Sequence, residues 1–230
     1  MAHDKKLFRE TEIYPIIFMI ILTILFVGVL SFFYNSQKRR IDNNQQISYY
    51  RNILELYNDK IPAVDFAILS DEEILTSVKE YLVEGTLITE KGERTYFKVV
   101  DNFTVIGYCF DIIGSGLWGT MQTVVAFDPT LTTLIDFNVY EQVETPGLGG
   151  RIGEPADKLK LRSDLKGSAF ISGEQQTKYI LILEGATPAN NSEVRQITGA
   201  TITSRSFLDM LYLEMERLLP LIKQEMAKGE

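Results

Sequence analysis

The sequence predicts an α+β fold, in which helices pack against an antiparallel sheet, preceded by one N-terminal transmembrane helix. Three observations lead to this prediction. An apolar run over residues 15–33 contains no charged residue and is long enough to cross a bilayer. Four β-rich runs follow within residues 95–139, and the turn residues between them favour antiparallel pairing. An amphipathic pattern near the C-terminus predicts a final helix packed on that sheet.

The apolar run is interpreted as an uncleaved membrane anchor over residues 14–34. Tyr14 and Tyr34 flank it, as aromatic residues do at membrane interfaces. A cleaved signal peptide is the alternative, but the run is longer than such a peptide needs, and residues 35–40 contain no small-residue cleavage site. Basic residues lie on both sides of the run, so the distribution of charge does not determine the orientation.

Composition excludes several classes of function. The net charge is −8 and no basic stripe occurs, so nucleic acid is not an expected partner. Cys109 is the only cysteine, which excludes a disulfide within the chain. His3 is the only histidine and lies in the N-terminal tail, so neither a histidine-based metal site nor a Ser-His triad is expected. Roughly 190 residues follow the anchor, enough for one domain with its own core.

Two helices are expected between the anchor and the strands. Apolar residues recur at helical spacing within residues 37–59, which predicts a juxtamembrane helix ended by Pro62. The sequence Ser70-Asp71-Glu72-Glu73 is a capping box and predicts a second helix over residues 71–83, closed by Gly85.

The strands and the C-terminal elements follow in order. Strands are predicted at 96–100, 104–112, 121–127 and 134–139, a short helix at 157–165 and a further strand-like run at 179–183. The final helix begins at the hydroxyl-rich residues 197–204, and Pro220 is expected to kink or end it. Its apolar stripe consists of Phe207, Leu211, Met215, Leu218 and Ile222.

A hydroxyl-rich stretch, residues 197–204, lies where this final helix begins. Its candidate ligands are the hydroxyls of Thr198, Thr201, Thr203 and Ser204, around the small pair Gly199-Ala200. A helix start offers unpaired amides and positive potential, and small residues let a phosphate approach the backbone. The stretch therefore predicts a phosphate site. The alternative is an ordinary helix cap that happens to be rich in Ser and Thr.

Two glycine-rich loops contain further candidate residues. Residues 114–121 place the only tryptophan, Trp118, in a tight turn, and residues 144–150 follow the last predicted strand. Each segment is also compatible with an ordinary turn. Together they offer an indole, the apolar Leu148 and exposed backbone amides to a flat aromatic ligand. With a phosphate site nearby, flavin mononucleotide (FMN) fits these features better than a metal.

The residues that carry these features also mark a resemblance. The chain resembles the covalent flavin subunits NqrC, of the sodium-pumping NADH:quinone oxidoreductase, and RnfG, of the ferredoxin:NAD oxidoreductase. The resemblance covers roughly residues 95–220 and the anchor. Its segments, in the family's order, are Gly116-Leu117-Trp118, Tyr140-Glu141-Gln142, Glu144-Thr145-Pro146-Gly147-Leu148-Gly149-Gly150 and Thr198-Gly199-Ala200-Thr201. The Gly-Leu-Trp turn and the doubled glycine favour the NqrC branch.

The resemblance implies a cofactor and its attachment. FMN would be joined through its phosphate to Thr201 by a separate flavin transferase that uses FAD and magnesium. Thr198, Thr203 and Ser204 would bind the phosphate oxygens, together with the backbone of Gly199 and Ala200. Arg195-Gln196 stands where the family has Asp-Gly, and Arg195 is expected to help neutralise the phosphate. Along the flavin ring the implied residues are Glu144, Thr145, Gly147, Leu148 and Gly149, with Trp118 covering one side.

The resemblance also implies a place in the cell. Residues 1–13 would be a cytoplasmic tail, 14–34 the transmembrane helix, 35–69 a juxtamembrane segment and 70–228 the FMN-binding domain, on the periplasmic or outer side of a bacterial inner membrane. Partners would be the lipid bilayer and integral membrane subunits of an Nqr-type or Rnf-type complex, within which the flavin would relay electrons between cofactors of the partner subunits. Two alternatives stay open: a membrane-anchored reductase that binds FMN reversibly, and a scaffold without cofactor.

Overall fold

The computed structural model describes residues 13–90, 92–172 and 175–228. The chain divides into two compact units, one up to Gln46 and one from Ile47 onward. The first unit contains most of helix α1 (Ile13–Glu55), and the second contains the end of that helix and all the other elements.

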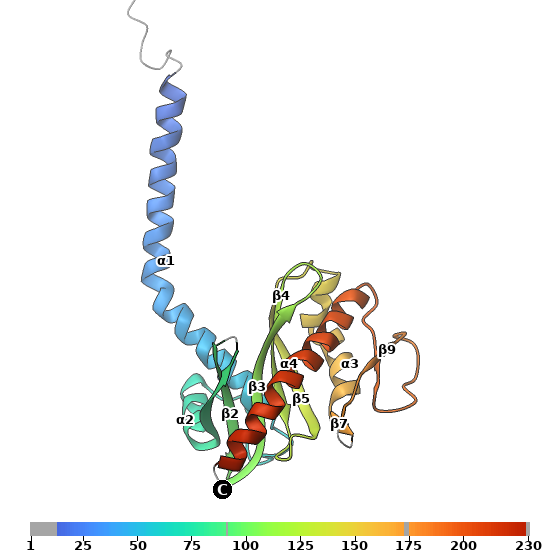
Figure 1. Ribbon diagram of the computed structural model, residues 1–230. Coiled ribbons are helices and arrows are strands. Elements are labelled where there is room, and N and C mark those ends of the chain that lie inside the picture. Colours follow the sequence, from blue (N-terminus) through green and yellow to red (C-terminus); the bar gives the residue numbers. More distant parts are fainter. Residues whose placement is uncertain (1–12, 91, 173–174, 229–230) are drawn as a thin grey trace, which may run out of the picture. The chain divides into compact units, whose positions relative to one another are not determined.

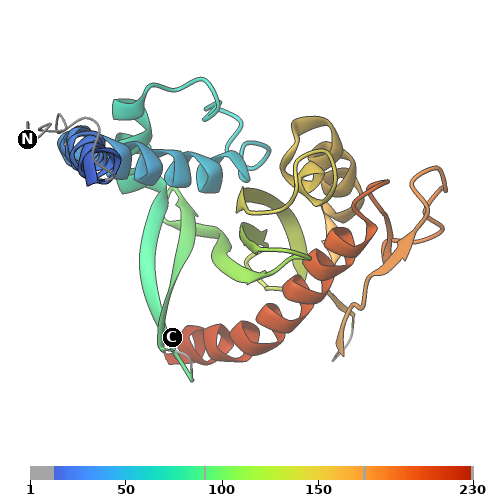
Figure 2. The same cartoon turned by 90° about the horizontal axis from the view of Figure 1, so that it is seen from above.

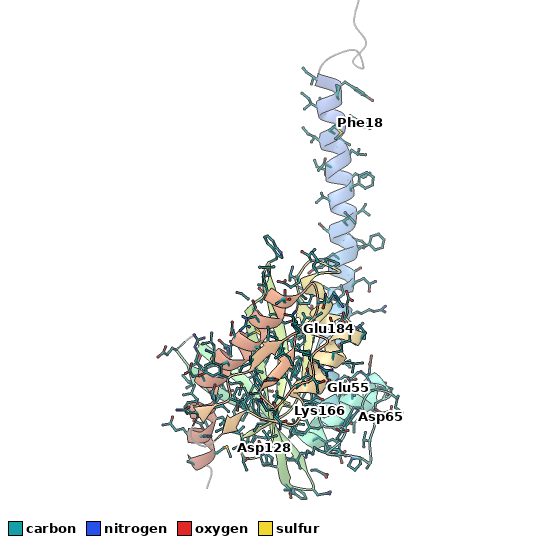
Figure 3. The ribbon with its side chains drawn as sticks, turned by 90° about the vertical axis from the view of Figure 1, so that its right-hand side faces the viewer. Phe18, Glu55, Asp65, Asp128, Lys166 and Glu184 are labelled. Carbon is teal, nitrogen blue, oxygen red and sulfur yellow. The ribbon has the colours of Figure 1, made fainter. Side chains whose placement is uncertain are left out.

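Helix α1 contains the apolar run, and its side chains, Phe18 among them, project outward around the helix (Figure 3). Among the described residues it is the one helix long and apolar enough to cross a membrane, which fits a single-pass anchor. The same helix continues without a break into the predicted juxtamembrane helix. It ends at Glu55, and turns over residues 56–60 precede Pro62.

The second unit is built on a six-stranded sheet in the order β1-β2-β3-β4-β5-β6, in which every neighbouring pair is antiparallel. Short turns join the first five strands, so the chain meanders across the sheet. The α+β architecture predicted from the sequence is therefore confirmed. The strands are β1 (Leu82–Thr89), β2 (Gly92–Asp101), β3 (Thr104–Ser115), β4 (Thr120–Phe127), β5 (Thr133–Gln142) and β6 (Ser168–Ala169).

The edge strand β1 corrects the sequence prediction. The capping box of Ser70 and Glu73 is present, but helix α2 (Asp71–Tyr81) gives way to β1 at Leu82. Gly85 therefore does not close a helix. It pairs with Tyr96 of β2, and a Cβ on Gly85 would lie 2.4 Å from the Tyr96 ring. The glycine makes room for an aromatic ring in the neighbouring strand.

Helices cover both faces of the sheet. Helix α4 (Thr201–Lys228) lies along one face, and the end of α1 with α2 lies on the other (Figure 2). Alternate residues of each strand enter the two cores: Phe110 packs on the α4 side, while the neighbouring Cys109 packs on the α1 side. Because Ile53 and Tyr57 belong to the second core, the compact unit begins well before the sequence-based domain boundary at residue 70.

Helix α4 crosses the sheet diagonally and continues past Pro220 to Lys228 (Figure 1). Of the two expected effects of Pro220, a kink or an end of the helix, the second does not occur. A proline inside a helix loses one backbone hydrogen bond, but the residues on both sides of it remain packed: Leu218 and Leu219 are 3% exposed and Ile222 is fully buried. The predicted apolar stripe of this helix is buried throughout.

Smaller elements lie beside the sheet. After β5 the chain forms the short 3₁₀ helix η2 (Gly149–Gly153) and α3 (Pro155–Leu165), the latter as predicted. Lys166, at the end of α3, pairs with Asp59 at 2.7 Å; Figure 3 labels this lysine. The run at 179–183 forms β9 (Ile180–Ile182), which pairs in parallel with β10 (Glu193–Arg195) in a sheet of its own. A last pair is β7 (Ile171–Ser172) with β8 (Gln175–Gln176).

Candidate functional site

The three segments singled out in the sequence meet at the buried carboxylate of Glu144, which is 6% exposed. Its Oε1 atom accepts hydrogen bonds from the backbone amides of Trp118 (2.8 Å) and Gly119 (3.1 Å). Its Oε2 atom accepts one from the hydroxyl of Thr203 (2.9 Å). We call this arrangement the Glu144 clasp. It fixes the β3–β4 turn and the loop after β5 to the first turn of α4.

Two glycines make the clasp possible. A Cβ on Gly116 would lie 2.4 Å from Oε1 of Glu144, and a Cβ on Gly149 would lie 2.2 Å from Oε2. Both distances are far below van der Waals contact, so any side chain at either position would displace the carboxylate. These two loop glycines are thus explained by packing around Glu144.

The clasp also sets the charge state of Glu144. Burial raises the pKa of this carboxyl, but the hydrogen bonds from Trp118, Gly119 and Thr203 outweigh burial, and the pKa is lowered overall. Glu144 is therefore a carboxylate at neutral pH, committed to protein donors. The sequence-based expectation placed Glu144 along a flavin ring. In the structure its carboxylate is instead hydrogen-bonded to protein donors and holds the neighbouring loops in place.

The turn that enters α4 presents Thr201 to solvent. Gly199 has φ +80°, a left-handed conformation that favours glycine, and Ala200 N donates to Ile197 O (2.9 Å). Thr201 is the first residue of the helix and is exposed, as is Thr198. The first amides of a helix have no intrahelical acceptor. The turn therefore places an exposed hydroxyl beside amides that are suited to an anion.

Thr203 and Ser204 point into the protein instead. Thr203 is 1% exposed and donates to Glu144, whereas Ser204 is fully buried and its Oγ accepts from Ile197 N (3.3 Å). Both hydroxyls are used in holding the turn together. The sequence contained a signal for this, because Thr203 lies four residues before Phe207 and so on the buried stripe of α4.

A network of charged side chains, not recognised in the sequence, surrounds Thr198. Arg151 of η2 donates through Nε to Asp157 (2.8 Å) and through Nη1 to the carbonyl oxygen of Thr198. Asp157 also pairs with Lys160 (3.3 Å), which pairs with Glu184 (2.7 Å), and Glu184 accepts from Thr198 N (3.1 Å). Figure 3 labels Glu184. We call this closed set the Arg151 network.

The cation that lies over the entry turn is Arg151 and not Arg195, which the sequence suggested. Arg195, expected near a phosphate, is bonded to Asp164 through Nε (2.9 Å) and Nη2 (2.5 Å). Arg151 instead lies over the entry turn, since a Cβ on Gly199 would lie 3.7 Å from its Nη1 atom. In the sequence, the indication of this role for Arg151 was its position directly after the loop over residues 144–150.

Exposed apolar side chains adjoin the clasp and the turn. Trp118 is 76% exposed and Leu148 is 54% exposed, and a Cβ on Gly199 would lie 4.0 Å from Cδ2 of Leu148. The loop that carries Leu148 is a tight turn in which Thr145 O accepts from Leu148 N (3.1 Å), with Gly147 at φ +73°. We call the exposed apolar side chains of these segments the apolar group: Leu117, Trp118, Val143, Leu148 and Ile202.

An exposed hydroxyl at a helix start, a neighbouring guanidinium and exposed apolar side chains fit a phosphorylated aromatic ligand. Comparison with known families agrees: residues 116–212 match the model described as "FMN-binding domain". That range contains the Trp118 turn, the whole of the second glycine-rich loop and the turn into α4. Residues 116–212 thus resemble an FMN-binding domain, and the sequence-based resemblance to the NqrC/RnfG type is confirmed.

Particular relatives point to one branch. The C subunit of the Na(+)-translocating NADH-quinone reductase of Yersinia pestis is 38% identical over 94 residues, which cover 40% of this chain and 34% of that protein. Its counterpart from Vibrio anguillarum is 33% identical over 91 residues, with the same coverage. The matched region thus spans about a third of the length of these relatives.

Solved structures share the fold. The structure of the corresponding reductase protein from Parabacteroides distasonis has a TM-score of 0.62 at 20% identity and covers 79% of this chain and 94% of that one. NqrC of Shewanella oneidensis has a TM-score of 0.57 at 19% identity, covering 72% and 91%. These similarities support the α+β fold.

Proposed function

We propose that this chain is a membrane-anchored flavoprotein, similar to NqrC, that carries FMN on Thr201 as a phosphoester and relays electrons in a sodium-translocating NADH:quinone oxidoreductase. The observation that carries the proposal is the position of Thr201. It is exposed at the first residue of α4, directly after the turn formed by the left-handed Gly199, within the segment that matches an FMN-binding domain. The relatives favour the NqrC-like complex over the ferredoxin-dependent one.

The helix start suits the attached phosphate. The amides of the first turn of α4 offer donors, and the helix dipole adds positive potential. Thr198 is exposed beside them. Thr203 and Ser204 contribute by holding the turn, since their hydroxyls are bonded within the protein. The sequence-based expectation was different, because in it all four hydroxyls, those of Thr203 and Ser204 included, bound the phosphate.

The apolar group suits the ring. Leu148 is exposed next to the entry turn and Trp118 is exposed in the β3–β4 turn, and both would contact a planar ring held through Thr201. Thr145 and Gly147 shape the loop that carries Leu148, and Gly149 leaves room for the carboxylate of Glu144. A flavin supplies one-electron and two-electron transfer when bound. No general base is required of the protein, whose task is to hold and orient the ring near the surface.

The anchor determines where such a carrier would work. Helix α1 fits a single-pass membrane segment. We place the domain on the periplasmic or outer face, with integral membrane subunits as the electron donor and acceptor and a flavin transferase as the maturation enzyme. A covalent link suits that location, because a carrier outside the cytoplasm that dissociated would be lost.

The decisive experiment is the intact mass of the polypeptide after co-expression with a flavin transferase. Wild type is expected to gain the mass of an FMN ester on the peptide that contains Thr201, and its band in a denaturing gel is expected to fluoresce under ultraviolet light. Thr201→Ala removes both signals, whereas Thr203→Ala keeps them. An unmodified wild-type mass would refute the covalent link, and yellow colour removed by dialysis would then indicate reversible FMN binding.

A further inference from the structure

Arg151 places a cation beside the turn that precedes Thr201. Its guanidinium lies over the turn that enters α4, 3.7 Å from the site of a Cβ on Gly199, two residues before Thr201. It reaches this place from η2, and its Nη1 atom donates to the carbonyl oxygen of Thr198. The side chain of Arg151 is 25% exposed, so the guanidinium faces the solvent that an attached group would occupy.

The guanidinium also has N–H groups, on Nη2, that no described residue accepts. Nε is bonded to Asp157 and Nη1 to Thr198, but Nη2 has no hydrogen-bond partner within residues 13–90, 92–172 and 175–228. Asp157 fixes the direction of the guanidinium plane. The charges of the Arg151 network balance, because Arg151 and Lys160 face Asp157 and Glu184. A phosphodiester would add one negative charge beside a pre-oriented donor, without any rearrangement of these pairs.

We infer that Arg151 is the phosphate-binding residue of this domain and that Nη2 of Arg151 donates to an oxygen of the FMN phosphate. The inference rests on the proposed function, since it concerns the same ligand on Thr201. It assigns to an arginine of η2 the role that the sequence suggested for Arg195. The remainder of the network positions Arg151 and the Thr198-Gly199 turn.

The test separates phosphate recognition from folding. In a Thr201→Ala background, which cannot be esterified at that position, the affinities of FMN and of riboflavin are measured by fluorescence titration of the full-length chain in detergent. Arg151→Gln is expected to weaken FMN binding about tenfold and to leave riboflavin binding unchanged, because only FMN carries the phosphate and a charged hydrogen bond has about this strength. Arg151→Lys should recover part of the loss, since it keeps the charge but loses the fork.

Arg195→Gln is the matched control, because Arg195 is also paired to an aspartate near the same turn. This variant should leave the affinities for FMN and for riboflavin unchanged. Equal losses for FMN and riboflavin in Arg151→Gln would reduce Arg151 to a structural role and overturn the inference, as would no loss, or a loss of FMN binding confined to Arg195→Gln.

A second measurement applies if the Thr201→Ala chain binds neither flavin. The ³¹P resonance of the esterified chain is then compared between wild type and Arg151→Gln; a shift supports the inference and an unchanged resonance overturns it. Failure of the proposed function looks different. In that case wild type is not esterified and binds neither flavin, and the inference falls with it.

Discussion

The carboxylate of Glu144 accepts a hydrogen bond from the hydroxyl of Thr203 at 2.9 Å, across a sequence separation of 59 residues. The same carboxylate holds the amides of Trp118 and Gly119. A single buried acid thus joins all three segments of the candidate site, and it does so with charge-assisted hydrogen bonds. The geometry of the site depends on this acid remaining ionised and correctly placed.

Replacing Glu144 with Gln should lower the free energy of unfolding by about 2 kcal/mol at pH 7, because a neutral amide is a weaker acceptor and directs N–H groups at donors. The pKa of Glu144 is lowered in the folded state. Its contribution is therefore present above the unfolded pKa of about 4.3 and is lost as the pH falls through the folded pKa. Denaturant unfolding of both proteins at pH 7 and pH 3 measures this; a constant difference would contradict it.

Thr201 and Thr203 should give opposite outcomes when each is changed to Ala. Thr201→Ala should abolish the flavin signal with a stability change below about 0.5 kcal/mol, because its side chain is exposed. Thr203→Ala should retain the flavin signal and lose about 1–3 kcal/mol, because it leaves a buried carboxylate oxygen unpaired. Gel fluorescence and thermal unfolding measure the two properties separately. Equal effects of the two variants on flavin attachment would contradict the assignment.

Gly149→Ala should be more damaging than its size suggests. The new Cβ would lie 2.2 Å from Oε2 of Glu144 and 2.5 Å from Oγ1 of Thr203, so the clasp must open. We expect a loss of about 2 kcal/mol or more and reduced flavin attachment. Gly185→Ala is the control, because nothing lies within 4 Å of a Cβ at that position. Equal unfolding temperatures for the two variants would count against the clasp.

Asp111, on the α1 side of the sheet, should make stability fall as the pH rises. Tyr140 donates to it at 2.9 Å, but burial dominates and raises the pKa of Asp111 to about 6; the hydroxyl of Tyr140 and the charge of Arg94 oppose the increase. Because the folded pKa exceeds the unfolded value of about 3.9, the stabilisation is complete below about pH 4 and is lost as the pH rises through about 6.

Asp111→Asn should remove this pH dependence, because the amide keeps the shape and an acceptor for Tyr140 but does not titrate. Relative to wild type, the variant should gain about 1–3 kcal/mol between about pH 4 and pH 7.5. Denaturant midpoints across that range, measured on full-length protein in detergent, provide the comparison. Parallel curves for the two proteins would show that Asp111 is not the titrating group.

The elements that local patterns predict were found where expected. The capping box of Ser70 and Glu73, four central strands and the start of α4 all depend on residues within a few positions of one another. The edge strand β1 was missed because its evidence is not local: Gly85 resembles a helix terminator until Tyr96 is placed beside it. Pro220 does not end the helix for a similar reason, since buried residues on both sides of it hold the helix together.

The sequence by itself determined the apolar helix that fits a membrane anchor, the fold class, the family resemblance and the choice of Thr201, because continuous apolar length, residue periodicity and motif order are properties of the linear chain. Only the tertiary structure decided which candidate residues face the site of a ligand and which hold the surrounding loops together. It turned Thr203 inward to Glu144, paired Arg195 with Asp164, and brought Arg151 over Gly199. These outcomes depend on contacts between side chains that are distant in the sequence, and local spacing along the chain contains no information about such contacts.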